Sequence, residues 1–219
     1  MINLDRITAV CWDGRPLTPE RSDRYHAIFK HMSNNFKFAA INLYINGDFN
    51  HEGVNITSIN QSSIDDYNAW CQTKLADSFN TEYVLVFQDD GFPINANNWT
   101  DEFYDYDYIG APWPLYIGWP KENFQVGNGG FSLRSKRLCA RVQSFPVSSS
   151  NEDAVLCSNL KPVLEKEGFK WASVDVAKRF AIEFHIDENH TLDSVFGFHG
   201  NVHNHELSLI HISEPTRPY

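Results

Sequence analysis

Residues 82–92 read EYVLVFQDDGF and decide the fold class of this chain. Residues 82–87 form an apolar run of β-branched and aromatic side chains, which is typical of a buried strand. The run stops abruptly at residues 88–91, Gln-Asp-Asp-Gly. Acids at the carboxyl end of a central strand lie where open α/β sheets place their ligands. The stretch therefore predicts a sheet strand and the edge of the sheet at which a site should lie.

The segments before this strand predict a parallel sheet. Residues 6–12 are apolar and end at Asp-Gly, which is typical of a buried strand entering a loop. A helix should follow over residues 18–32, because Thr-Pro-Glu at its start supplies an N-cap, a proline at the first helical position and an early acid. Residues 38–45, FAAINLYI, predict the next strand. Strand, helix and strand in this order begin a parallel α/β sheet.

The later segments are less regular. Residues 101–120 gather aromatic residues, prolines and glycines, which favours irregular, site-forming structure. The whole pattern predicts one α/β domain over residues 1–207, with a mostly parallel, Rossmann-like sheet flanked by helices, and a foreign or disordered tail over residues 208–219. The other expected elements are a loop over 46–62, helices over 63–78, 135–143 and 152–167, a glycine-interrupted strand over 124–134, and strands over 171–176 and 181–184.

The composition limits the class of protein. A chain of 219 residues that is 42% hydrophobic can bury one sizeable core. It has no run of about 18 apolar residues and no signal-peptide pattern, so we expect a cytoplasmic protein without stable membrane insertion. The cysteines form no CxxC pair, which favours reduced thiols. The net charge of -10 opposes non-specific binding to nucleic acid or anionic membrane.

Asp89 and Asp90 are adjacent carboxylates at the end of a buried strand. Their mutual repulsion and desolvation require a compensating cation. Mg²⁺ or Mn²⁺ prefers carboxylate oxygens and keeps positions open for substrate phosphates. The pair therefore predicts a metal site that holds a nucleotide diphosphate, and the alternative is a solvated Asp-Asp-Gly turn without metal.

Residues 127–131 read GNGGF. Gly129 and Gly130 allow a ligand to approach the backbone closely, and the Asn128 amide can hydrogen-bond hydroxyls. The loop therefore suits sugar recognition, and the alternative is a glycine-bearing bulge without a ligand.

Glu152 and Asp153 stand at the start of a predicted helix. The helix dipole favours ionised carboxylates there, and an ionised carboxylate can accept a proton from an acceptor hydroxyl. The alternative is that these acids only stabilise the first helical turn.

His199 stands in the sequence FGFHGN, where small neighbours leave room for its ring. A neutral imidazole with such room can reach a metal ion. A satisfied core or surface histidine is the alternative, and His203 and His205 are better explained as surface or tail residues.

Taken in chain order, FQDDGF, NWTDEFYDYDYIGAPW, VGNGGFSLRSKRL, NEDAVLC and FGFHG resemble a bacterial and viral family of glycosyltransferase-like domains of unknown function. The resemblance covers about residues 5–205, and the ordered set is more specific than any single motif. The wider class is the nucleotide-diphospho-sugar transferases with the GT-A fold. Family members often stand beside or are fused to sugar transferases, so other transferase domains are expected partners.

The resemblance implies roles for the motifs. The acidic pair that binds the metal and the diphosphate in this class matches Asp89 and Asp90, and the catalytic base matches Glu152 and Asp153. The usual motif is Asp, any residue, Asp, whereas this chain has Gln88 before its two aspartates. Metal binding is therefore expected to rest on Asp90. His199 is the further ligand expected for the metal. Thr8, Asp13 and Arg15 are expected at the nucleotide, and Trp113 and Trp119 are expected to stack on sugar rings. The other residues expected to bind the donor are Gln88, Asn128, Gly129, Gly130 and Arg134.

The motifs together predict a metal-dependent glycosyltransferase that moves a sugar from a nucleotide-diphosphate donor to a hydroxyl of a glycan, with inversion. Metal on Asp90 and His199 would neutralise the leaving diphosphate, while Asp153 deprotonates the acceptor that Glu152 orients. Three alternatives stay open: glycosylation of hydroxymethylated bases in viral DNA, a non-catalytic sugar- or nucleotide-binding module, and a metal-dependent hydrolase or nucleotidyltransferase. The net negative charge disfavours the DNA-modifying transferase. The absence of P-loop, HExxH and GxSxG motifs disfavours the hydrolase or nucleotidyltransferase.

Overall fold

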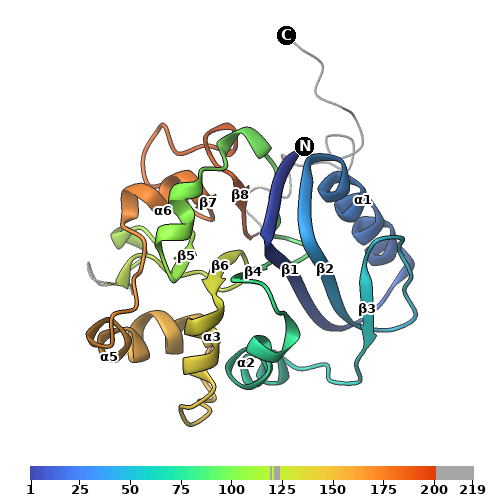
Figure 1. The fold of residues 1–219 in the computed structure, drawn as a ribbon, viewed down its shortest axis with the longest axis horizontal. Coiled ribbons are helices and arrows are strands. Elements are labelled where there is room, and N and C mark those ends of the chain that lie inside the picture. Colours follow the sequence, from blue (N-terminus) through green and yellow to red (C-terminus); the bar gives the residue numbers. More distant parts are fainter. Residues whose placement is uncertain (119, 121–123, 201–219) are drawn as a thin grey trace.

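The computed structural model describes residues 1–118, 120 and 124–200, and its centre is a six-stranded sheet (Figure 1). The strand order is β3-β2-β1-β4-β6-β5. The pairs of β1 with β2, β1 with β4 and β2 with β3 are parallel, whereas β6 runs antiparallel to both of its neighbours. The predicted mostly parallel α/β sheet is therefore confirmed. The strands are β1 (Ile2–Pro16), β2 (Phe36–Asn46), β3 (Asn55–Ser58), β4 (Tyr83–Val86), β5 (Tyr108–Gly110) and β6 (Ser132–Ser135).

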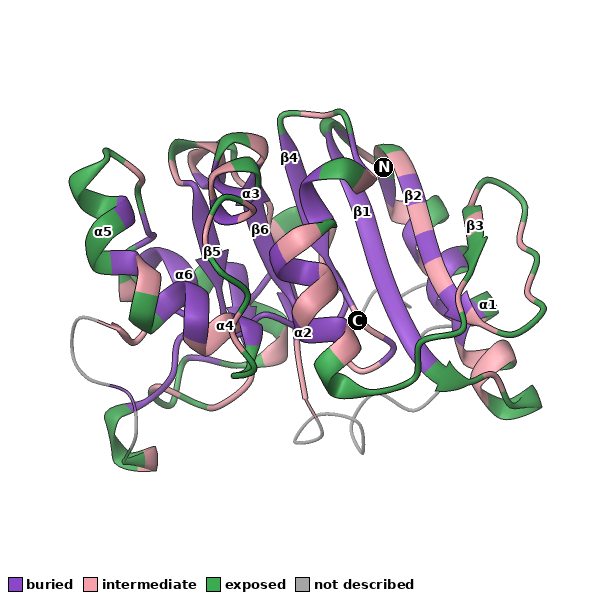
Figure 2. Ribbon diagram, turned by 90° about the horizontal axis from the view of Figure 1, so that it is seen from below, coloured by how far each residue is buried: buried purple, intermediate pink, exposed green. Residues whose placement is uncertain are grey.

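The long strand β1 is buried on both faces, as its continuous apolar run predicts (Figure 2). Ile7 and Cys11 belong to the same core cluster as the buried residues of α1 (Pro19–Asn35). Val10 packs on the opposite side with residues of the 3-10 turn at Leu75–Ser78. Helical segments therefore cover both faces of the sheet around β1.

The two helices of the first half begin where the sequence predicts. The Thr18 hydroxyl accepts a hydrogen bond from the Arg21 N–H and caps α1. Ser63 and Asp66 form a capping box at the start of α2 (Ile64–Thr73). The predicted loop over residues 46–62 is wrong in part, because it contains β3. This short edge strand has the polar sequence NITS and is mostly exposed, so no apolar alternation marks it.

The second half combines short helices with irregular segments. The predicted helix over residues 152–167 is present, with one wide turn inside it. The predicted strand over residues 171–176 is wrong: Ser173 caps a helix there, and Trp171 makes only an isolated bridge to Tyr108. The elements are α3 (Lys136–Val142), α4 (Glu152–Ala154), a π-helical turn (Val155–Leu160), α5 (Lys161–Lys166), α6 (Val174–Phe180), and the parallel pair β7 (Ala181–Ile182) and β8 (Gly197–Phe198).

The irregular region expected over residues 101–120 contains β5 and the 3-10 turns Asp101–Asp105 and Leu115–Ile117. Two further 3-10 turns lie outside it, at Ala96–Asn98 and Leu192–Ser194. Among the described residues, no helix is both long and apolar enough to cross a membrane. The predicted tail, with His203 and His205 before it, lies outside the described residues.

Candidate active site

A cleft of about 260 Å³ opens at the carboxyl ends of β1 and β4. This is the edge of the sheet at which the acidic motif led us to expect a site. The cleft is bounded on one side by the last residues of β1 and on the other by the start of α2. Its lining residues are Cys11, Trp12, Asp13, Gly14, Arg15, Tyr25, Ser62, Ser63, Ile64, Tyr67, Gln88 and Asp90.

Two arginines and two aspartates form a charged cluster beside this cleft. Asp13 accepts hydrogen bonds from Arg15 Nε at 3.0 Å, from the Tyr25 hydroxyl at 2.6 Å and from Arg21. Asp89 accepts one from Arg15 Nη2 at 2.5 Å, and Arg21 Nε lies 3.8 Å from its other oxygen. Asp89 is buried, and guanidinium groups supply the cation that its charge requires. The structure therefore places Asp89 with the arginines and away from the expected metal position.

Asp90, by contrast, lies beside His199. His199 Nε2 is 3.1 Å from Gln88 Oε1 and 3.7 Å from Asp90 Oδ1. Its other nitrogen, Nδ1, is 2.9 Å from Asn128 Nδ2 and 3.5 Å from Glu183 Oε1. The fold thus joins residues 88–90 after β4, the glycine loop before β6 and the segments around β7 and β8 at one imidazole ring.

The charges around the ring shift two pKa values. Burial lowers the pKa of His199, but the hydrogen bond to Glu183 and the charges of Asp90, Glu183 and Asp153 outweigh it, so the pKa is raised above its ordinary value. Burial raises the pKa of Glu183, but hydrogen bonds to His199, Asn128 and Trp113 outweigh it, so the pKa is lowered. Glu183 is therefore a carboxylate at neutral pH.

The glycines of the loop make room for side chains of the chain itself. A Cβ atom on Gly130 would overlap the His199 ring, and one on Gly129 would overlap the Glu152 carboxylate. Asn128, between Gly127 and Gly129, is the one described non-glycine residue with positive φ, at 60°. Its Oδ1 accepts a hydrogen bond from the Phe131 N–H, which fixes the amide against the histidine. The expected close approach to a ligand is thus replaced at these two glycines by internal packing.

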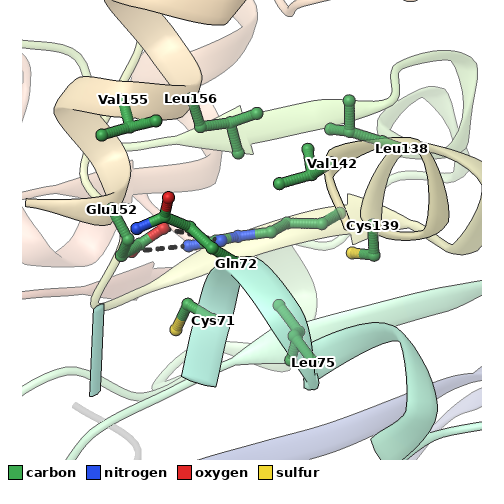
Figure 3. Close-up of a pocket in the computed structure, with 10 residues that line it drawn as sticks. Cys71, Gln72, Leu75, Leu138, Cys139, Val142, Glu152, Val155 and Leu156 are labelled. Carbon is green, nitrogen blue, oxygen red and sulfur yellow. Dashed lines mark hydrogen bonds and ion pairs between the residues drawn. The ribbon is translucent and has the colours of Figure 1, made fainter. Parts of the chain in front are cut away.

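Glu152 and Arg134 form a buried ion pair behind the site. Both carboxylate oxygens of Glu152 accept hydrogen bonds from Arg134, at 2.8 and 2.9 Å, and both side chains are almost fully buried. Glu152 lines a small cavity of about 10 Å³. Figure 3 shows the Glu152 carboxylate together with other lining residues, among them Leu156 and Val142. Neither charge reaches the cleft. The expected contacts of Glu152 with the acceptor and of Arg134 with the diphosphate therefore stay predictions, and each of these side chains has the other as its ion-pair partner.

Asp153, the neighbour of Glu152, turns the other way. Its Oδ2 accepts a hydrogen bond from the Gly129 N–H at 3.2 Å, and its side chain is half-buried. Its charge contributes to the raised pKa of His199, so the two groups interact electrostatically. Asp153 therefore binds the backbone of the glycine loop at Gly129, next to Gly130, against which the His199 ring packs.

Two other expected ligand residues lie away from the cleft. Thr8 is buried in the middle of β1, and its hydroxyl pairs with the Thr81 hydroxyl at 2.8 Å. The Trp113 ring is buried and a Cβ atom on Gly127 would overlap it, so it has no free face for a sugar. Trp119 lies outside the described residues.

Sequence reasoning missed Glu183. It follows β7 directly, its Oε2 accepts a hydrogen bond from Trp113 Nε1 at 2.9 Å, and its Oε1 faces His199. The available signal was an acid inside the apolar run AIEF, which we interpreted only as strand. Its partners are 16 and 70 residues away along the chain, so no local pattern reveals them.

Few side chains at the cleft could hold a divalent cation. In the described part of the chain, no group of three His, Cys, Asp or Glu residues is arranged to hold a metal ion. Asp90 and His199, with the Gln88 carbonyl, offer a smaller set of oxygen and nitrogen atoms around one position. Mg²⁺ commonly binds through one or two carboxylates and completes its shell with substrate phosphates and water. The residues therefore fit an ion that a diphosphate helps to hold, and they do not fit an independent protein cage.

The sheet topology and the position of the cleft define an open α/β fold with a site at the carboxyl ends of its strands. By sequence, the chain belongs to the family described as Protein of unknown function (DUF5672), whose model matches residues 52–199. No curated protein sequence matches the chain.

Solved structures with a similar fold are glycosyltransferases. Mannosyltransferase PcManGT from Pyrobaculum calidifontis, in complex with GDP-Man and Mn²⁺, aligns with a TM-score of 0.50 and 9% identity over 78% of this chain and 55% of its own. Galactosyltransferase LgtC, in complex with donor and acceptor sugar analogs, aligns with a TM-score of 0.47 and 13% identity over 88% of this chain and 86% of its own. TarS from S. aureus aligns with a TM-score of 0.43 and 11% identity over 69% of this chain and 53% of its own. The chain thus spans about half the length of PcManGT and of the TarS fragment, and the PcManGT match confirms the GT-A-like fold.

Proposed function

We propose that this chain is a glycosyltransferase that moves a sugar from a nucleotide-diphosphate donor to a hydroxyl of a glycan acceptor. The observation that carries the proposal is that Asp90, which lines the 260 Å³ cleft at the carboxyl ends of β1 and β4, lies 3.7 Å from His199, while Asp153 binds the glycine loop on which the His199 ring packs. The GT-A-like fold supports it, and so does the nucleotide sugar with Mn²⁺ in the similar mannosyltransferase structure.

The donor occupies the cleft in this proposal. Trp12 and Tyr67 give the cleft aromatic walls against which a nucleoside can pack. The Arg15 side chain is 58% exposed, although it also binds Asp13 and Asp89. An exposed guanidinium at the mouth of the cleft can bind a diphosphate bidentately. Arg15 therefore takes the diphosphate-binding role that the sequence had also led us to consider for Arg134.

Asp90 and His199, with Gln88, would hold Mn²⁺ or Mg²⁺ together with the donor phosphates. Such an ion neutralises negative charge that develops on the leaving diphosphate. Asp89 has no place in this set, because Arg15 and Arg21 already bind its carboxylate.

Asp153 is the proposed general base. It accepts the proton of the acceptor hydroxyl while that oxygen forms a bond to the anomeric carbon, and the bond from this carbon to the diphosphate oxygen breaks with its electron pair. Attack from the face opposite the leaving group inverts the configuration. The Gly129 N–H holds one oxygen of Asp153 and so orients the carboxylate.

The test is a screen of nucleotide sugars for thermal stabilisation and sugar transfer to glycan acceptors, with and without Mn²⁺. Asp90→Asn is compared with Asp105→Asn, which removes an exposed carboxylate on the 3-10 turn Asp101–Asp105. We expect one donor to stabilise the wild type with Mn²⁺ and to be turned over, and Asp90→Asn alone to lose both effects. Binding without turnover of any donor would instead support a binding module, and a response to free DNA rather than to glycans would change the acceptor.

A further inference from the structure

Arg15 binds the two aspartates of the charged cluster with different edges of its guanidinium group. Its Nε and Nη2 atoms each donate to Asp13 at 3.0 Å, and Nη2 also donates to Asp89 at 2.5 Å. A planar guanidinium has one fork formed by Nε and Nη2 and a second formed by Nη1 and Nη2. Asp13 occupies the first fork, so Asp89 takes the Nη2 hydrogen of the second. A phosphate that binds the second fork bidentately must therefore displace Asp89, whereas Asp13 can stay.

Asp89 needs another cation when Arg15 leaves it. Its side chain is 4% exposed, and removing one partner of a buried ion pair leaves an uncompensated charge that strongly destabilises the fold. The Oδ1 atom of Asp89 is the one that Arg15 binds, whereas its Oδ2 atom faces Arg21. A replacement for Arg15 is therefore expected from the side of Arg21.

Arg21 has an unused donor at this position. Its Nη1 donates to the backbone carbonyls of Arg15 and Pro16 at 2.9 and 2.7 Å, and its Nη2 donates to Asp13. Its Nε is buried, lies 3.8 Å from Asp89 Oδ2 and has no hydrogen-bond partner among the described residues. Buried donors without a partner are rare in folded proteins. A movement of about 1 Å would bring Nε to hydrogen-bond distance from the carboxylate.

We propose that Arg21 is a positioning residue of the donor site, which takes over Asp89 when Arg15 turns its second fork to the diphosphate. The inference rests on the proposed function for the identity of that ligand. Asp89 thereby competes with the diphosphate for Arg15, and Arg21 lowers the cost of displacing it. Arg21 acts without touching the ligand, because its side chain is 16% exposed and the cleft is lined by other residues.

The first experiment measures the affinity of the full chain for GDP, UDP and inorganic pyrophosphate by calorimetric titration. Asp89→Asn removes the charge that holds Arg15, and we expect binding to tighten by about three- to tenfold, since hydrogen bonds to charged groups are about twice as strong as neutral ones. Arg21→Gln leaves Asp89 dependent on Arg15, and we expect binding to weaken by about tenfold. Asp23→Asn and Arg24→Gln remove the same charges elsewhere on α1 and should leave the affinity unchanged.

Double variants separate this exchange from a direct effect of charge on the ligand. Arg15→Met removes the donors of Arg15 and keeps a side chain of similar length. The gain from Asp89→Asn should vanish in the Arg15→Met background, and the loss from Arg21→Gln should vanish in the Asp89→Asn background. Equal changes in both backgrounds would overturn the proposal. The melting temperature shows which variants fold, and if Arg21→Gln does not, the pair of Asp89→Asn and Arg15→Met decides alone.

The second experiment needs no ligand. Crystal structures of wild type and Arg15→Met compare the distance between Arg21 Nε and Asp89 Oδ2. We expect the 3.8 Å of the wild type to shorten to about 2.7–2.9 Å in Arg15→Met, because the carboxylate has lost its first partner. An unchanged distance overturns the exchange. If the wild type binds none of the three probes, the diphosphate site of the proposed function fails, while this comparison still decides whether Arg21 replaces Arg15 at Asp89.

Discussion

The two arginine–carboxylate clusters of this protein use the same chemical groups with opposite consequences. In the first half of the chain, Arg15 binds Asp13 and Asp89 while more than half of its side chain remains exposed at the cleft. In the second half, Arg134 and Glu152 are enclosed, with 3% and 4% of their side chains exposed. A cluster open to solvent can exchange partners with a ligand, whereas a buried pair cannot release either charge without a large desolvation cost. Burial, not residue type, therefore separates the candidate binding arginine from the structural one in this protein.

The largest expected effect distinguishes the adjacent acids Asp153 and Glu152. Asp153→Asn should lower turnover of the donor found in the screen by about 10²–10⁴-fold, because it removes the proposed base. Its stability should fall only slightly, since the side chain is half-buried and the asparagine oxygen can still accept one of the two backbone hydrogen bonds, from Gly129 or from Ala154. Steady-state kinetics and thermal unfolding measure the two quantities. Full activity of Asp153→Asn would remove it from the mechanism.

The buried pair should dominate stability. Glu152→Gln leaves the Arg134 charge without its counterion, and we expect a loss of about 3–5 kcal/mol in the free energy of unfolding, measured with guanidinium chloride. The double variant Arg134→Met with Glu152→Leu should recover most of it, because an apolar pair needs no desolvation. Glu167→Gln, which breaks the more exposed pair with Arg141, should cost far less. Equal losses at the two sites would contradict the comparison.

The open cluster should affect binding more than folding. Arg15→Gln removes an exposed guanidinium, and we expect nucleotide-diphosphate affinity to fall by about tenfold or more, since a hydrogen bond to a charged group contributes about 1.5–3 kcal/mol. Stability should change less than in Glu152→Gln, because Arg21 still binds Asp13 and lies near Asp89. Calorimetric titration with GDP and UDP measures the affinity. An unchanged affinity would mean that Arg15 serves only the aspartates.

The smallest expected effect concerns pH and His190 near β7. Burial, and to a smaller extent the charges of Lys178 and His185, lower the pKa of His190. The hydrogen bond with the Ala181 carbonyl and the charge of Asp187 raise it but do not compensate, so the pKa lies below its ordinary value. The unfolded chain therefore binds a proton at higher pH than the folded chain does. The contribution of His190 to stability is constant above the ordinary histidine pKa and decreases as the pH falls below it.

The measurement is the free energy of unfolding of wild type and His190→Gln as a function of pH. The pH range runs from about 7.5 to about 5, because it must span the ordinary histidine pKa of about 6.5. The variant lacks this titration, so its stability should fall less steeply over the range. His199, whose pKa is raised, contributes in the opposite direction in both proteins and cancels in the difference. Identical slopes would show that His190 does not contribute.

Several features could be predicted because their signals are local. The N-caps Thr18 and Ser63 and the buried strand before Asp89 are encoded by residues within a few positions of one another. The exposed edge strand at 55–58 and the helix after Ser173 were missed, because the first has no apolar alternation and the second was outweighed by neighbouring β-branched residues. The proximity of Asp90, Asp153 and His199 was expected only through the order of motifs.

By itself, the sequence determined the parallel α/β core and the edge of the sheet at which polar residues gather, because strand periodicity and helix caps act over a few residues. Only the tertiary structure decided how the charges divide. It paired Asp89 with Arg15, enclosed Glu152 with Arg134, and placed Asp90 and Glu183 beside His199. Charge compensation and burial depend on partners tens of residues away, and these meet only when the chain has folded.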